Sequence, residues 1–172
     1  MSKSVAMAMV AGICIFGGGA KAESLDASAK CLADNMYFEA RDDGPAGWSA
    51  VGHVTLNRWH RAVRVRSSVT VCDIVYAGAR HGHHHCQFSW VCQRKGGVIH
   101  EKAEAAKIRD FSYRLLRENL SDPTGGATFF HEKRVHPRWA RDGTAIRTTS
   151  IGRHYFYKPA HQTEVAEFFD AR

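Results

Sequence analysis

The sequence predicts a single domain of the α+β class, mainly helical, with a small β element near the C-terminus. Three observations lead to this prediction. Apolar residues recur at three- and four-residue spacing through much of the chain, as they do in amphipathic helices. Two short segments rich in Phe and Tyr follow a Gly-Gly turn near the C-terminus. A length of 172 residues, 44% of them hydrophobic, suits one globular domain.

The N-terminal segment has the features of a secretory signal. Lys3 precedes an apolar stretch from Val5 to Phe16, and the segment ends in Ala20-Lys21-Ala22, a small-x-small cleavage pattern. The apolar stretch is too short to span a bilayer comfortably. We therefore expect residues 1–22 to be removed, leaving a domain of residues 23–172 without a membrane span. The protein is then exported to the periplasm, the cell envelope or the exterior.

Removal of this signal changes the charge and the cysteine count. The formal charge of +7 falls to +5, because 22 Lys and Arg remain against 17 Asp and Glu. A basic exported protein favours an anionic partner. The mature chain keeps an even number of cysteines, which in an exported protein predicts two disulfides. Three connectivities are open, and the spacing does not choose among them; the cysteines are Cys31, Cys72, Cys86 and Cys92.

Helices are expected in four places. The first is capped by Asp26 or Ser28 and stopped by Asp42-Asp43-Gly44-Pro45, because the residue before a proline avoids helical geometry. Residues 78–97 lack periodicity and predict a loop. The expected helices comprise residues 27–41, 46–61, 69–77 and 100–120.

The β element follows a turn at residues 122–126. Residues 127–131 and 151–158 are the two strand candidates, the second rich in Tyr and Phe. Among the four tryptophans, Trp48 and Trp59 fall within a predicted helix and are expected in the core. Trp90 and Trp139 fall in predicted loops and are candidates for a cleft.

Glu39 is the most informative carboxylate, because Tyr37 and Phe38 precede it on the first predicted helix. A carboxyl group in a partly dry aromatic setting has a raised pKa and keeps its proton near neutral pH. That property suits a general acid that protonates a leaving glycosidic oxygen. A lone glutamate is nevertheless more often solvated, or paired here with Arg41 or Arg58.

Five segments in a fixed order strengthen the case for Glu39. They are residues 31–41 (Cys-Leu-Ala-x-x-Met-Tyr-Phe-Glu-Ala-Arg), 47–58 (ending in Asn57-Arg58), 71–76 with 86–90, 122–131, and 151–157. In this order they resemble the SleB/CwlJ-type cell wall hydrolases. Any one segment is a weak signal, whereas the ordered set is specific.

The resemblance implies a lysozyme/lytic-transglycosylase-like domain that acts on the glycan strands of peptidoglycan. It implies that Glu39 is the catalytic residue, and that the cleft is lined by substrate-binding residues from the third segment and the C-terminal strands: Gln87, Ser89, Phe130, His131 and Tyr155. Two departures stand out. Asp43 occupies a position where the family usually has Glu, and histidines at positions 81 and 83–85 form an unusual insertion.

The carboxylates favour a one-acid mechanism. Asp43 follows Glu39 by four residues, so the two carboxylates would lie close together if the helix continued through Asp43. Gly44-Pro45 is expected to end the helix first, and no second acid has a comparable aromatic setting. A lytic transglycosylase that forms 1,6-anhydro-MurNAc needs one carboxyl group, no metal and no cofactor. Hydrolysis by water in the same site is the nearest alternative.

Three other functions remain open. The first is a zinc amidase that uses histidines at positions 81, 83–85, 131, 136 and 154, although a surface histidine run is the simpler interpretation. The second is a cysteine nucleophile, which two disulfides would remove. The third is an exported module that binds the wall without cleaving it. Nucleic acid is not an expected partner, and the sequence does not indicate an oligomer, so a monomer is assumed.

Overall fold

A helical unit and a small antiparallel sheet form the fold of this computed structural model, which describes residues 23–79, 86–93 and 97–161. The predicted signal at residues 1–22 and the histidines at 81 and 83–85 lie outside the described residues. The predicted class, a mainly helical α+β fold, is confirmed. The α-helices are α1 (Leu25–Ala40), α2 (Gly44–Val65), α3 (Val71–Val75) and α4 (Lys102–Arg117).

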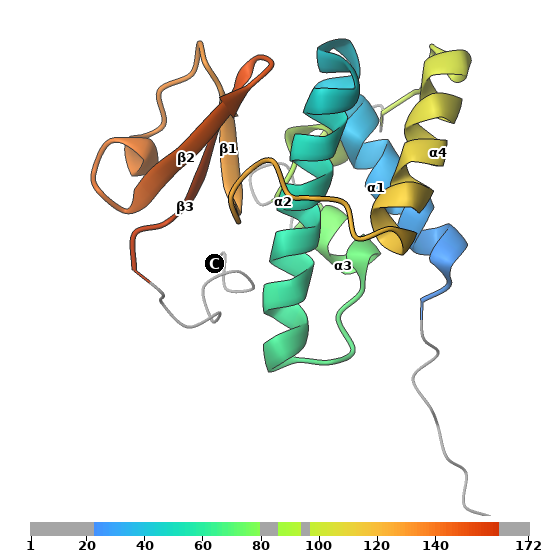
Figure 1. Cartoon of the computed structure of the whole chain (residues 1–172), viewed down its shortest axis with the longest axis horizontal. Helices are drawn as coiled ribbons and strands as arrows, with labels where there is room; N and C mark the ends of the chain where they lie inside the picture. The colour runs from blue at the N-terminus through green and yellow to red at the C-terminus, as the bar shows by residue number, and fades with distance from the viewer. Residues whose placement is uncertain (1–22, 80–85, 94–96, 162–172) are drawn as a thin grey trace, which may run out of the picture.

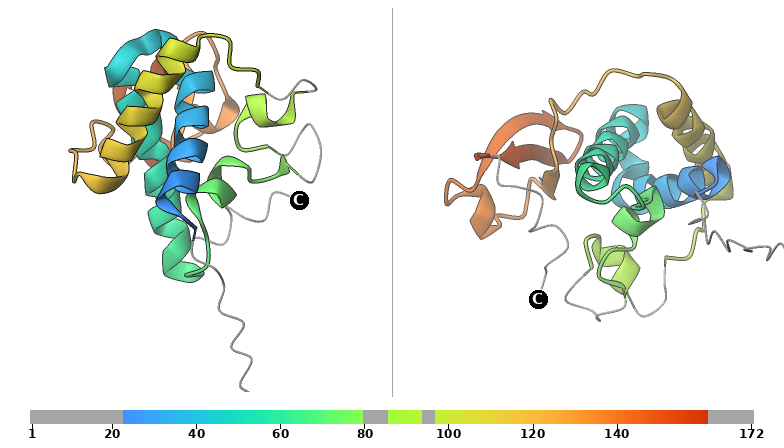
Figure 2. Two further views of the ribbon diagram at one scale, coloured as in Figure 1. Left: turned by 90° about the vertical axis from the view of Figure 1, so that its right-hand side faces the viewer. Right: turned by 90° about the horizontal axis from the view of Figure 1, so that it is seen from below.

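Helix α2 lies in the middle of the molecule. Figure 1 shows the sheet on one side of α2 and helices α1 and α4 on the other, and the second view of Figure 2 agrees. Short 3-10 turns connect these parts: η1 (Arg41–Asp43), η3 (Ser89–Cys92) and η4 (Arg138–Ala140).

The four predicted helices are confirmed, with different ends. Ser24, and not Asp26 or Ser28, caps α1, because its hydroxyl accepts a hydrogen bond from the Ala27 amide. Helix α2 begins two residues earlier than predicted. Gly44 adopts a φ of +64° there, a conformation that glycine adopts easily, and Pro45 follows in the first turn.

The helical core lies between α1, α2 and α4. Leu32, Met36, Val51 and Ile108 are fully buried in it. Gly52 permits this packing, because a Cβ atom at that position would lie 2.6 Å from the Leu115 side chain and 3.0 Å from the Met36 sulfur. The 3.6-residue period of the sequence therefore identified the buried helix faces correctly.

The sheet has the strand order β1-β3-β2 and is antiparallel throughout. It comprises β1 (Phe129–Glu132), β2 (Ala145–Ile151) and β3 (His154–Pro159). The predicted strand at residues 127–131 corresponds to β1. The one predicted at residues 151–158 corresponds to β3, but its first residue ends β2 and a turn at residues 152–153 precedes β3. Strand β2 was not predicted, because its middle residues, Arg147 to Ser150, show no alternation of apolar and polar side chains. One face of the sheet packs on α2 through Phe130 and Phe156.

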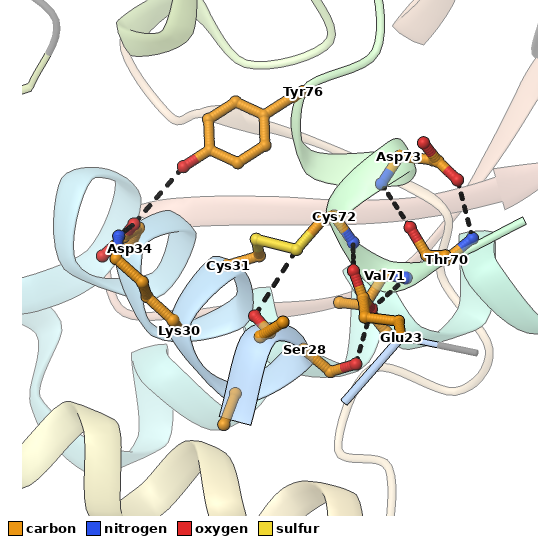
Figure 3. The surroundings of a disulfide bond; sticks show 12 residues. Glu23, Ser28, Lys30, Cys31, Asp34, Thr70, Val71, Cys72, Asp73 and Tyr76 are labelled. Carbon is orange, nitrogen blue, oxygen red and sulfur yellow. Dashed lines mark hydrogen bonds and ion pairs between the residues drawn. A yellow bond between two sulfur atoms is a disulfide. The ribbon is translucent and has the colours of Figure 1, made fainter. Parts of the chain in front are cut away.

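Both predicted disulfides are present, and the structure selects their pairing. Cys31–Cys72 joins α1 to α3, and Cys86–Cys92 closes the loop that contains η3. Figure 3 shows Glu23 beside the first bridge, where its carboxylate accepts hydrogen bonds from the Val71 and Cys72 amides at 3.1 and 3.4 Å. The start of α3 is therefore held both covalently and by a carboxylate at its N-terminus.

None of the helices among the described residues is long and apolar enough to cross a membrane.

Candidate active site

A small open cleft of about 170 Å³ lies where the end of α1 meets η3 and the sheet. Its floor and walls come from five separate parts of the chain, so only the folded protein assembles it. The lining residues are Glu39, Arg58, Gln87, Phe88, Ser89, Phe130, His131, Glu132 and His154.

Glu39 occupies the last turn of α1 and is half-buried. Burial raises the pKa of its carboxyl group from 4.5 to about 7, because loss of water disfavours the charged form. The positive charge of Arg58 opposes this shift, and the negative charge of Glu132 adds to it. Glu39 is therefore a carboxyl group that is poised to give up and take back a proton near neutral pH.

Arg58 is the cation of the cleft. Its side chain comes from α2 and is buried, its Nε donates to the Thr128 carbonyl at 2.6 Å, and its guanidinium lies over the Phe88 ring at 5.1 Å. Burial lowers the pKa of Arg58 to about 10, while Glu39 acts in the opposite sense. Among the described residues, Nη1 of Arg58 has no hydrogen-bond partner. That N–H group is a buried hydrogen-bond donor without an acceptor among the described residues.

The neighbouring Asn57 helps to place the sheet over Glu39. Its side-chain amide donates to the Ala127 carbonyl at 3.0 Å and to the Asp122 carboxylate at 2.9 Å. Asn57 and Arg58 thus hold the segment that leads into β1 at two successive carbonyls. The Asn57-Arg58 pair therefore connects α2 to the sheet through hydrogen bonds.

Trp90 has a structural role, so its assignment as a cleft candidate is wrong. It is 8% exposed, stacks on Phe38 with ring centroids 4.5 Å apart, and donates from its indole to Asn35 at 3.0 Å. Asn35 is fully buried one turn before Glu39, and it also donates to Thr55 at 3.0 Å. Trp90 therefore holds η3, and with it Ser89, against α1.

Asp43 is also structural. Its carboxylate accepts hydrogen bonds from His154 Nδ1 at 3.1 Å and from Arg153 Nε at 3.1 Å, and both Asp43 and His154 have nearly buried side chains. Burial lowers the pKa of His154, with Asp43 opposing that shift. The acid that the sequence analysis set aside thus ties η1 to β3, and it does not line the cleft.

The structure brings four of the five predicted substrate-binding residues to the cleft beside Glu39: Gln87, Ser89, Phe130 and His131. Tyr155 is not among the lining residues. The cleft also contains Glu132, which the sequence analysis missed. The alternation of side chains along a strand could have identified Glu132, because Phe130 and Glu132 share one face of β1.

No group of three His, Cys, Asp or Glu side chains that could hold a metal ion occurs in the described part of the chain. His131 contacts the Tyr157 hydroxyl, His154 contacts Asp43, and His136 is exposed. The histidines at 81 and 83–85 lie outside the described residues, so the zinc hypothesis is not tested by this geometry.

A family model described as Cell Wall Hydrolase matches residues 42–157, two thirds of the chain. The match includes α2, the loop with η3, strands β1 and β2 and most of β3. It begins three residues after Glu39 and so leaves out α1. Comparison with curated proteins and with solved structures gives no match.

Proposed function

The chain belongs to the cell wall hydrolase family, and on that premise we propose that it cleaves the glycan strands of peptidoglycan with Glu39 as general acid and base. Membership of this SleB-type family makes peptidoglycan the substrate class. The choice of the glycosidic bond between MurNAc and GlcNAc, and of Glu39, is our proposal.

The pKa of Glu39 is the observation that carries this proposal. At about 7 it leaves a large fraction of the enzyme with a protonated carboxyl group at neutral pH. An ordinary glutamate, with a pKa near 4.5, is almost entirely ionised there and cannot donate a proton. The cleft thus supplies the acid that departure of a sugar hydroxyl requires.

We favour a lytic transglycosylase reaction. Glu39 donates its proton to the glycosidic oxygen, and the bond from MurNAc C1 to that oxygen breaks. The resulting Glu39 carboxylate then accepts the proton of the MurNAc C6 hydroxyl, whose oxygen bonds to C1 and closes the 1,6-anhydro ring. Glu39 ends in its starting protonation state, and no water is consumed. The positive charge of Arg58, which acts on Glu39 in the resting enzyme, is suited to stabilise the carboxylate between these two steps.

Glu132 gives hydrolysis a specific observation in its favour. It lines the same cleft from β1 and acts electrostatically on Glu39, so a second carboxylate is available to activate water. It also forms an ion pair with Arg134. In this second candidate mechanism Glu39 remains the acid and Glu132 becomes the base.

Mass analysis of muropeptides released from purified peptidoglycan distinguishes these reactions. The transglycosylase predicts 1,6-anhydro-MurNAc ends from the wild type and none from Glu39→Gln. Glu118→Gln is the matched control, because it makes the same change at an exposed position on the far end of α4. Reducing MurNAc ends without anhydro product would replace transglycosylation with hydrolysis, and Glu132→Gln would then abolish turnover. Activity retained by Glu39→Gln would remove Glu39 from the role.

The setting of this reaction is outside the cytoplasm. A cell wall substrate and two disulfides both indicate an exported protein. We propose that residues 1–22 are the cleaved signal and that the mature enzyme acts in the periplasm or cell envelope. N-terminal sequencing of the exported protein, with Glu23 as the first residue, tests that assignment.

A further inference from the structure

The positive charge of the protein is concentrated in its sheet region. Residues 129–161 contain seven Lys and Arg but two Asp and Glu, a surplus of five. The rest of the predicted mature chain, residues 23–128 and 162–172, contains fifteen of each sign and is neutral. All seven cations are exposed: Lys133, Arg134, Arg138, Arg141, Arg147, Arg153 and Lys158. The surplus positive charge therefore favours contact of this region with an anionic partner.

The sheet has a second face, which is turned away from α2. Side chains alternate along a strand, and residues paired across two strands share a face. Phe130 pairs with Phe156, and both pack on α2. His131, paired with Tyr155, therefore projects from the other face, which we call the outer face. Tyr155 does not line the Glu39 cleft, whereas its cross-strand neighbour His131 does.

Aromatic rings gather on the outer face. Trp139, from η4, contacts Phe129, His131 and Tyr157, with ring centroids between 5.2 and 5.5 Å apart. The His131 ring stacks on Tyr157 and lies 5.8 Å from Tyr155. Trp139 and Tyr155 both remain partly exposed. Two aromatic rings are thus accessible on the same face of the sheet.

Cations flank the accessible ring of Tyr155. The guanidinium of Arg147, from β2, lies 4.8 Å from the ring centroid, and Lys133 Nζ, just after β1, lies 5.7 Å from it. The ion pairs found among the described residues leave Lys133 and Arg147 without an acidic partner. The outer face therefore combines ring surfaces with positive charges that form no ion pair with a carboxylate of the described residues.

Peptidoglycan offers the complementary chemistry. Its amino sugars present apolar C–H faces that stack on aromatic rings, and its stem peptides carry carboxylates that attract cations. We propose that the outer face, defined by Trp139, Tyr155, Lys133 and Arg147, is a second peptidoglycan-binding surface, separate from the Glu39 cleft. It holds a neighbouring stretch of the wall while the cleft cuts, and this assignment rests on the proposed function.

Binding to insoluble peptidoglycan tests the surface without turnover when every protein carries Glu39→Gln. Lys133→Glu/Arg147→Glu is the test pair, and Lys102→Glu/Arg64→Glu is the control pair. All four positions are exposed and both pairs change the net charge by the same amount. We expect the test pair to raise the Kd roughly five- to tenfold, as two reversed surface charges allow. The control pair should change the Kd less than twofold.

The contribution of the aromatic rings to binding at the outer face is tested by comparing Tyr155→Ala with Tyr155→Phe, because Phe keeps the ring and Ala removes it. Binding should weaken in the first variant and persist in the second, with thermal unfolding showing that both are folded. With Glu39 intact, the test pair should cut a short soluble glycan fragment at the wild-type rate, since the cleft is unchanged.

Three outcomes would overturn the proposal. Equal losses from the test and control pairs would mean that net charge alone is responsible. No loss from the test pair would exclude the outer face. Loss of binding to vesicles of anionic phospholipid, with peptidoglycan binding retained, would assign the surface to a membrane. Failure of the proposed function is a separate result, because it appears as absent glycan products from the wild type while these binding measurements stay interpretable.

Discussion

Glu39→Gln is expected to stabilise the protein at high pH while it removes activity. Folding moves the pKa of Glu39 from 4.5 to about 7, so the folded protein binds its proton more tightly than the unfolded chain does. The folded state is therefore penalised as pH rises from 4.5 to about 7, when the buried carboxyl group must ionise. The Glu39→Gln variant carries no such penalty, because the amide that replaces the carboxyl group stays neutral at every pH.

The size of the effect follows from the pKa values. The change in pKa from 4.5 to about 7 corresponds to about 3.4 kcal/mol once both states are fully ionised. At pH 5 the unfolded chain is only partly more ionised than the folded protein, and the penalty is about 0.8 kcal/mol. Between pH 5 and pH 8 the stability of Glu39→Gln should thus rise relative to wild type by about 2.5 kcal/mol.

Urea unfolding of both proteins at pH 5 and pH 8 measures this difference. The contributions of the other titrating groups to the pH dependence largely cancel, because both proteins contain these groups. Glu118→Gln, at an exposed site, should show no comparable rise between the two pH values. If the free energies of unfolding of the wild type and Glu39→Gln differ by the same amount at pH 5 and at pH 8, the pKa of Glu39 is not raised. That result would refute the physical basis of the proposed acid.

Three further predictions concern activity and stability. Turnover that needs protonated Glu39 should decline toward tenfold per pH unit above about pH 7, and a flat kcat/KM profile from pH 6 to pH 9 would contradict it. Replacing both cysteines of Cys31–Cys72 by Ser should cost about 4 kcal/mol, against about 2 kcal/mol for Cys86–Cys92, because the first bridge closes a much longer loop; guanidinium unfolding measures both. Asp43→Asn should destabilise the protein by about 2 kcal/mol and lower kcat, since it weakens the hold on His154 at the cleft; unchanged urea midpoint and rate would contradict this.

Local patterns in the sequence predicted the helical unit well, because helices depend on contacts between residues three and four positions apart. Their ends were less predictable. Ser24 and Asp26 are both good caps, and only the folded chain shows which oxygen reaches the Ala27 amide. Strand β2 escaped detection for a related reason, because its pairing with β3 lies outside any short window.

Much of the candidate site was also accessible from the sequence. Glu39 was identified from its aromatic neighbours and from the ordered segments, and Gln87, Ser89, Phe130 and His131 do lie beside it. Glu132 was not predicted, although the alternation of side chains along a strand places it on the same face of β1 as Phe130. Tyr155 does not line this cleft, and its role in binding the substrate stays a prediction.

The sequence by itself determined the class of fold, the number of disulfides and the resemblance to cell wall hydrolases, and it supplied Glu39 as the leading candidate for the acid. These properties reside in residue types and their local spacing. Only the tertiary structure decided the disulfide pairing, the burial of Trp90, the bond from Asp43 to His154 and the separation of two sheet faces. Each of these depends on residues far apart in the chain that folding brings into contact, and so does the dryness that raises the pKa of Glu39.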